Sequence, residues 1–140
     1  VSGITMFNRF YSPDIDIIKE ELISADVLSH PDEYLMPLRW TGIMAQKVAC
    51  PLAATTGIHS AETAIKFLLA GANAVQIASV LYNGGAGVIS QINQQIEVWM
   101  GEKGYSSISD FKGKLAIEKQ HAAIYERAQF MKYFGGKKVH

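Results

Sequence analysis

The sequence predicts an α/β fold in which parallel strands are joined by helical crossovers. Three short apolar runs suit buried strands, and they lie at residues 3–10, 52–56 and 74–79. Segments in which apolar residues recur at helical spacing lie between these runs and after the last one. Strand–helix–strand units with short links form a parallel sheet with right-handed crossovers.

The composition fits a folded domain and excludes two classes of partner. Of the 140 residues, 49% are apolar, which is enough to bury a core. Lysine and arginine total 13, aspartate and glutamate also total 13, and no basic stripe follows a helix, so we expect no nucleic-acid partner. No apolar run approaches the roughly 18 residues of a membrane span, so we expect no membrane association. The single cysteine, Cys50, fits a reducing compartment and a cytoplasmic location.

The length and the first residues predict that the chain is part of a larger fold. It begins with Val1 and enters a strand-like run almost at once. A full (β/α)8 barrel, or TIM barrel, takes roughly 250 residues, and this chain has a little over half of that. We therefore expect one domain over residues 1–140 that forms part of a barrel. Barrel strands and helices would occupy residues 1–115, and a C-terminal helix and tail would occupy residues 116–140.

The segment between the first two predicted strands is harder to interpret. Within residues 14–28, Ile15 and Ile17 alternate as in a strand, whereas Ile18 and Leu22 have helical spacing, so both readings stay open.

A helix over residues 31–46 is indicated more clearly. Ser29 can serve as its cap, and Pro31 suits its first turn.

Helix-ending signals mark the later elements. Ser60 can cap a helix that stops at Gly71 in a left-handed conformation. A long amphipathic helix follows the third strand and ends at Gly104. Two further helical pieces are predicted, at residues 108–119 and 122–134.

Two predicted loops are candidates for binding an anion. In parallel α/β folds, ligands gather at the carboxyl ends of the strands, where loops meet helix N-termini. Residues 55–60 and 79–84 occupy such positions after two successive strands. Gly57 allows a ligand to approach the backbone, and backbone N–H groups near a helix N-terminus favour an anion. The pattern alone fits ordinary turns equally well, with Gly57 serving the turn geometry and Ser60 capping the helix.

Several short motifs follow one another from the second predicted strand onward. They are Ala-Thr-Thr-Gly-Ile at 54–58, Leu-Ala-Gly-Ala at 69–72, Val-Gln-Ile-Ala-Ser at 75–79, Glu-Lys-Gly-Tyr at 102–105, Ser-Ile at 107–108 and Asp-Phe-Lys-Gly-Lys-Leu at 110–115. Together they resemble the last two strands and the tail of dihydroorotate dehydrogenases, in particular the soluble class 1 members and the related dihydropyrimidine dehydrogenase domain. The resemblance covers residues 50–115 well, and Asn8 more loosely. It implies that residues 1–140 are the C-terminal portion of an FMN-binding (β/α)8 barrel.

The resemblance implies an FMN-dependent oxidoreductase of pyrimidine biosynthesis that oxidises a dihydropyrimidine such as dihydroorotate. In this family backbone amides after the last two strands hold the FMN phosphate, and an asparagine after an earlier strand binds the pyrimidine ring. Asn8 matches that asparagine, and Arg9 follows it in the predicted substrate site. The implied cofactor-binding residues are Thr55, Thr56, Gly57, Ala78 and Ser79.

This chain departs from the family pattern at several of these positions. Thr56 replaces the first of two glycines, and its hydroxyl can add a hydrogen bond to the phosphate. Arg9 replaces a small hydroxyl residue, and its guanidinium can clamp a carboxylate or a phosphate where the familiar substrate would lie. Residues 29–40 stand in place of a glycine-rich segment.

No catalytic residue and no metal ligand is expected in this chain. The family's catalytic base and its flavin-contacting lysine lie upstream, so residues 1–140 alone are expected to be inactive. Cys50 precedes its strand, away from the ligand end, and fits a structural or free thiol. His59 is more typical of a solvated loop residue than of a ligand.

The expected partners are a small dihydropyrimidine-like substrate and the N-terminal part of the barrel, and a homodimer is possible. Two alternatives stay open. One is a non-catalytic half-barrel or phosphate-binding module, and the other is a phosphate-binding TIM-barrel enzyme that uses no flavin.

Overall fold

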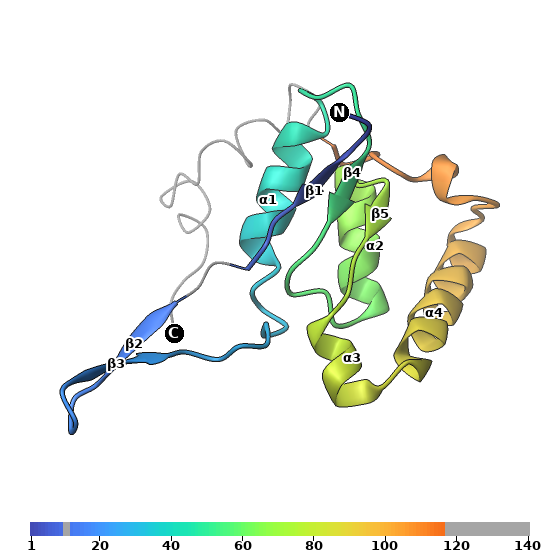
Figure 1. The fold of residues 1–140 in the computed structure, drawn as a ribbon. Helices are drawn as coiled ribbons and strands as arrows, with labels where there is room; N and C mark the ends of the chain where they lie inside the picture. Colours follow the sequence, from blue (N-terminus) through green and yellow to red (C-terminus); the bar gives the residue numbers. More distant parts are fainter. Residues whose placement is uncertain (10–11, 117–140) are drawn as a thin grey trace, which may run out of the picture.

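The computed structural model describes residues 1–9 and 12–116. These residues contain a three-stranded parallel sheet with the order β1-β4-β5 (Figure 1). The strands are β1 (Ile4–Met6), β4 (Leu52–Ala54) and β5 (Ala74–Val75). Thr5 pairs with Ala53, which in turn pairs with Ala74. The predicted parallel strands are confirmed, although each is shorter than the apolar run that predicts it.

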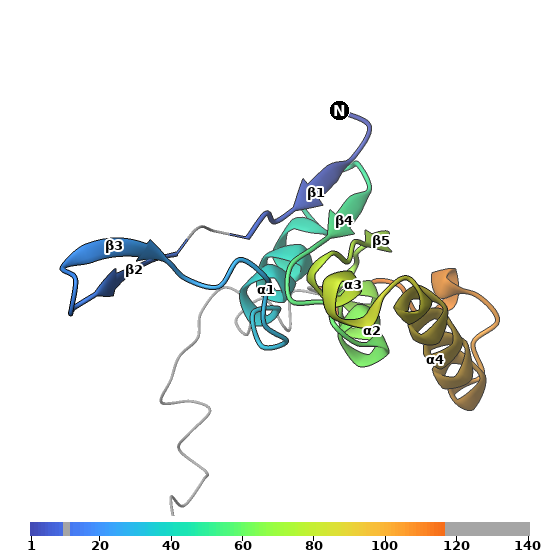
Figure 2. The same cartoon turned by 60° about the horizontal axis from the view of Figure 1, so that its bottom comes forward.

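Helices cover one side of this sheet. Both α1 and α2 lie on the same side, where α1 contacts β4 and α2 contacts β5 (Figure 2). α4 packs against α2, and the main core is formed by apolar residues of these two helices, of β4 and of the segments that flank α2. The helices are α1 (Leu35–Met44), α2 (Ala61–Ala70), α3 (Ser79–Gly84) and α4 (Gly87–Lys103).

The two faces of the sheet differ in burial. Met6, Leu52 and Ala54 point toward the helices and are buried. Thr5 and Ala74 belong to the opposite face and are exposed. Parallel sheets normally have both faces covered, whereas the described residues of this chain cover only one. The outer edges of β1 and β5 are also unpaired within this part of the chain.

The segment that the sequence leaves open is an antiparallel hairpin of β2 (Pro13–Asp16) and β3 (Glu21–Ser24). It projects from the body of the molecule (Figure 1). Ile15 pairs with Leu22, and these two side chains are 61% and 76% exposed. Of the two readings, the strand is therefore correct and the helix is wrong.

The ends of the helices test the predicted caps. Ser60 accepts a hydrogen bond from the Thr63 amide, and Gly71 and Gly104 are left-handed, so the predicted limits of α2 and α4 are confirmed. The helix predicted over residues 31–46 begins only at Leu35 and ends at Met44. Its predicted cap was wrong because Ser29 bonds to other partners, described below.

The segment after α4 is mostly not helical. Only a short 3-10 turn, η1 (Ile108–Asp110), forms there, so the helix predicted over 108–119 is wrong in its described part. Phe111 is fully buried against the rings of Trp99 and Tyr105, which fixes this segment by packing rather than by helical hydrogen bonds. The helix predicted over 122–134, and all of the predicted tail after Ala116, lie outside the described residues.

The helices formed by residues 1–9 and 12–116 include none that is both long and apolar enough to cross a membrane.

Candidate functional site

A cleft of about 400 Å³ lies at the carboxyl ends of the three parallel strands. All of the predicted site residues line it: Asn8, Arg9, Thr55, Thr56, Gly57, Ala78 and Ser79. They follow β1, β4 and β5 respectively, and the segment 27–29 closes the cleft from another side. The topology therefore brings together seven residues from three distant segments of the sequence, which is the arrangement that the parallel-sheet prediction requires.

The loop after β4 has an uncommon backbone conformation. Thr56 and Gly57 have φ angles of 80° and 73°, both in the left-handed region. A Cβ atom on Gly57 would lie 2.4 Å from the backbone nitrogen of Tyr34. Glycine is therefore required here by the close passage of the segment before α1, in addition to any role toward a ligand.

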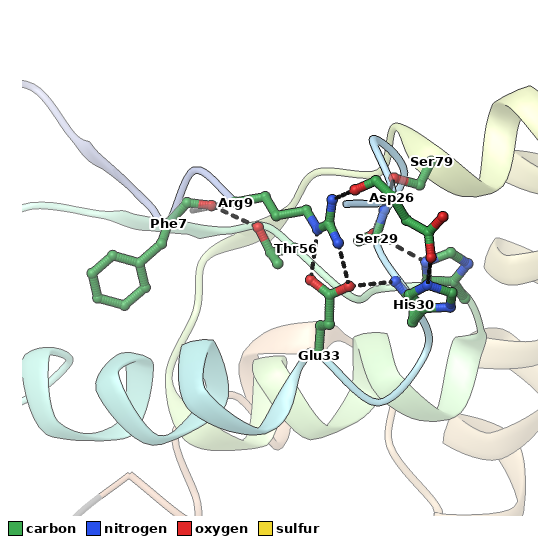
Figure 3. A network of polar contacts seen from close by, with 9 residues as sticks. Phe7, Arg9, Asp26, Ser29, His30, Glu33, Thr56 and Ser79 are labelled. Carbon is green, nitrogen blue, oxygen red and sulfur yellow. Dashed lines mark hydrogen bonds and ion pairs between the residues drawn. The ribbon is translucent and has the colours of Figure 1, made fainter. Parts of the chain in front are cut away.

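The Thr56 hydroxyl serves the fold. It donates a hydrogen bond of 2.8 Å to the carbonyl oxygen of Phe7 and so ties the β4 loop to the end of β1 (Figure 3). A hydroxyl has a single proton, so this side chain does not offer its proton to a ligand. The expectation that it adds a bond to a phosphate does not fit this geometry.

Backbone amides at the cleft remain free to bind an acceptor. Within the described residues, the N–H groups of Thr56, Gly57, Ala78 and Ser79 donate no hydrogen bond to another part of the chain. Two of them follow β4, and two follow β5. Residues that line one cleft and have unpaired N–H groups are suited to binding an anion such as a phosphate.

The predicted second loop is a short helix, and Ser79 is its first residue. The Ser79 hydroxyl oxygen accepts from the Ser29 amide at 2.9 Å and from the Ser29 hydroxyl at 3.0 Å. The Ser29 hydroxyl also lies 3.1 Å from Nε2 of His59. Sequence reasoning missed this role of Ser29, because the serine before Pro31 looks like a helix cap and its real partner is 50 positions away.

The guanidinium of Arg9 is engaged by the chain itself. Its Nε donates to Oε2 of Glu33 at 2.8 Å and its Nη2 to Oε1 at 3.0 Å, while Nη1 donates to the carbonyl of Asp26 (Figure 3). The two side chains are 24% and 27% exposed. The carboxylate that Arg9 clamps is therefore that of Glu33. The side-chain amide of Asn8 has no partner among the described residues and is exposed.

The same carboxylate organises the segment before α1. Oε1 of Glu33 also accepts from the His30 amide at 2.9 Å, and the His30 ring lies 2.7 Å from Oδ2 of Asp26. The hydrogen bonds from Arg9 lower the pKa of the Glu33 carboxyl. The hydrogen bond to Asp26 raises the pKa of His30. Charged groups thus hold residues 26–33 against the end of β1.

A second cleft, of about 440 Å³, is lined by both members of this ion pair. It shares Asn8, Arg9 and Thr56 with the first cleft, and its remaining lining is largely apolar, with Phe7, Met36, Pro37 and Trp40. Arg9 therefore lies where the two clefts meet, and Glu33 lines the second cleft.

Two other predictions concern residues outside the cleft. Cys50 lies just before β4, at the opposite end of the sheet, as predicted. His59 is half-buried and bonded to Ser29 rather than simply solvated. The described residues contain no group of histidine, cysteine, aspartate and glutamate side chains that could hold a metal ion.

Comparison with known proteins identifies several relatives. The chain is 32% identical over 114 residues to dihydroorotate dehydrogenase B (NAD+), catalytic subunit, of Pyrococcus furiosus, a match that covers 79% of this chain and 38% of that protein. It is 31% identical over 116 residues to the protein of the same name from Trichlorobacter lovleyi, and this match covers 81% of the chain and 38% of the relative. Dihydroorotate dehydrogenase A (fumarate) of Lactococcus lactis subsp. cremoris is 41% identical over 61 residues, or 44% of the chain and 20% of the relative.

No family model matches the chain. The matched part spans 38% of the length of the Pyrococcus furiosus relative, well under half. The similarity nevertheless recurs in both the A and the B forms of the enzyme. The chain is therefore related to the dihydroorotate dehydrogenase family.

Proposed function

We propose that this chain forms the C-terminal part of an FMN-dependent, dihydroorotate dehydrogenase-like oxidoreductase and holds the phosphate of the FMN. The observation that carries the proposal is the cleft at the strand ends, which is lined by four residues whose backbone amides have no partner within the described residues. The relatives named above supply the class of reaction.

The residues present fit a phosphate group. The amides of Thr56, Gly57, Ala78 and Ser79 would donate to its oxygens, and they would need no cation to do so. The residues that line the cleft beside these amides, at positions 55–58 and 76–79, carry no carboxylate that would repel an anion. FMN, when bound, would supply the acceptor for a hydride from the substrate.

This chain would also contribute to the substrate end of the cleft. Asn8 is exposed there, and its amide can both donate to and accept from a ring that carries carbonyl and N–H groups. The base that removes a proton from a dihydropyrimidine would come from outside residues 1–140. Because Glu33 holds Arg9, we propose that Asn8 rather than Arg9 recognises the substrate.

The open face of the sheet supports the barrel part of the proposal. The exposed face and the two unpaired edges, at β1 and β5, are what a barrel would close with further parallel strands. The N-terminal part of the same protein would supply those strands. We propose a cytoplasmic location for the complete enzyme.

The test uses the full-length protein. A flavin absorption spectrum, with FMN identified by mass after release, is the expected result. Ala78→Asp adds a negative charge at an exposed position in the cleft and should weaken FMN binding by about tenfold or more, because a carboxylate and a phosphate repel each other at short range.

Ala78→Asn is the matched control, since it has nearly the same shape and no charge, and it should retain most of the affinity. Equal affinities of the two variants would contradict the phosphate assignment. Phosphate binding without any flavin binding would favour a barrel enzyme of another type.

A further inference from the structure

Three side chains from distant parts of the sequence form a chain of hydrogen bonds at the edge of the cleft. Ser29 lies between Ser79, 3.0 Å from its hydroxyl oxygen, and His59, 3.1 Å from its Nε2. Figure 3 shows Ser29 beside Ser79, above the segment that leads to Glu33. Ser29 and Ser79 line the cleft, whereas His59 reaches it only through Ser29.

Counting protons shows what Ser79 can offer a ligand. A serine hydroxyl can accept two hydrogen bonds and donate one. Ser79 accepts from both the amide and the hydroxyl of Ser29, so both acceptor positions are used. Its own proton is then left to be donated into the cleft, toward a negatively charged ligand.

This arrangement requires one particular form of His59. Ser29 has one hydroxyl proton, and that proton is donated to Ser79. Ser29 must therefore accept from His59, which requires a proton on Nε2. If the proton were on Nδ1 alone, the two hydrogen bonds between Ser79, Ser29 and His59 would have the opposite donors. Ser79 would then donate to Ser29, Ser29 would donate to His59, and the cleft would face a lone pair of Ser79.

We propose that His59 is a positioning residue for the anion in the cleft, acting through Ser29 to turn the Ser79 hydroxyl into a donor. The identity of that anion as the FMN phosphate rests on the proposed function. The two directions of the hydrogen-bond chain differ in what they present to the ligand, so an anion selects the form with the proton on Nε2. By linkage, that form of His59 binds the anion more tightly.

The binding test compares two flavins that differ only in the phosphate, FMN and riboflavin, on the full-length protein. The ratio of their dissociation constants isolates the phosphate contribution. Ser79→Ala should reduce the preference for FMN by about tenfold, because a hydrogen bond to a charged group is lost. His59→Leu and Ser29→Ala should each reduce it by about threefold, because the donor loses its orientation and polarisation.

Two controls separate positioning from a general structural effect. His59→Gln keeps an N–H donor near the position of Nε2 and should retain the preference within about twofold, while His59→Leu does not. The double variant Ser29→Ala with His59→Leu should lose no more of the preference for FMN than either single variant, because both substitutions break the same chain of hydrogen bonds. An unchanged FMN-to-riboflavin ratio in both single variants would overturn the proposal.

A spectroscopic measurement makes the outcome independent of flavin. With 15N-labelled histidine, the full-length protein saturated with inorganic phosphate should show His59 protonated on Nε2, and Ser29→Ala should remove that preference. An Nε2 that remains unprotonated with phosphate bound, or the absence of phosphate binding, would overturn the positioning role. A protein that binds phosphate as expected but binds no flavin would overturn the proposed function and leave the positioning role supported.

Discussion

The cleft has two walls that are held in place by different physical means. The first wall, residues 55–58 and 76–79, follows β4 and β5 and rests on the apolar core, where Ala54, Ile58 and Phe67 are almost fully buried. The second wall, residues 8–9 and 27–29, is held in place by the Arg9–Glu33 pair and by the other polar contacts of residues 26–33. The first wall therefore depends on backbone conformation and packing, and the second depends on charges that water partly reaches.

This difference bears on what each wall is suited to do. Packed interiors resist small displacements, so the first wall can hold backbone amides at fixed positions. Ion pairs at partly exposed positions contribute less and respond to pH and salt. These properties suit the proposed roles of the two walls. The first wall would hold an invariant group, the phosphate, and the second would adjust to the substrate.

The largest expected effect comes from the first wall. Gly57→Ala should destabilise the full-length protein by about 3 kcal/mol, since a left-handed conformation and a clash with the Tyr34 backbone add together. Urea unfolding measures this change. Gly101→Ala is the control, because a Cβ at that position in α4 meets nothing within 4 Å.

The control should be neutral or stabilising by up to about 1 kcal/mol, because alanine favours a helix over glycine. If Gly57→Ala unfolded at the same urea concentration as the native protein, the close passage of Tyr34 would not constrain the first wall.

The same contrast explains which features the sequence could predict. The cap at Ser60 and the helix stops at Gly71 and Gly104 depend on neighbouring residues, and they are found where they were predicted. So are the parallel strands, because buried apolar runs are a local signal. The seven site residues meet in one cleft because the ends of parallel strands share an edge.

The second wall depends on contacts that no local pattern reveals. Arg9 and Glu33 are 24 positions apart, and nothing near either residue indicates the other as a partner. Ser29 has the local features of a helix cap, yet its hydroxyl bonds to Ser79 instead, and α1 begins later than predicted. The hairpin was ambiguous for a related reason, because its apolar residues are exposed and its period was not set by burial in a core.

A smaller effect is expected at the second wall. Glu33→Gln removes the charge that holds Arg9 while keeping the size of the side chain, and it should cost about 1 kcal/mol, because the pair is only partly shielded from water. Hydrogen exchange should locate the change, since the His30 amide donates to Glu33 and should exchange faster in the variant.

Glu21→Gln is the matched control in the hairpin. Glu21 pairs with Lys19, but these side chains are 55% and 66% exposed, so the change should have almost no effect. Equal and negligible effects of the two substitutions would mean that charge does not hold the second wall in place.

The smallest expected effect is a dependence of the second wall on pH. The pKa of Glu33 is lowered from 4.5 by Arg9, so its contribution is complete above that value and is lost as the pH falls through the folded-state pKa. The pKa of His30 is raised from 6.5 by Asp26, so its contribution is complete below that value and is lost as the pH rises through the folded-state pKa.

The residue-30 amide, corrected for its intrinsic exchange rate, should be best protected from hydrogen exchange between these two values. Glu33→Gln should flatten the acidic side of the profile and His30→Asn the alkaline side. Residues 55–58 and 76–79 carry no ionisable side chain, so the protection of their amides should follow global stability alone. The same pH profile for the amides of both walls would show that the two walls are not held in place separately.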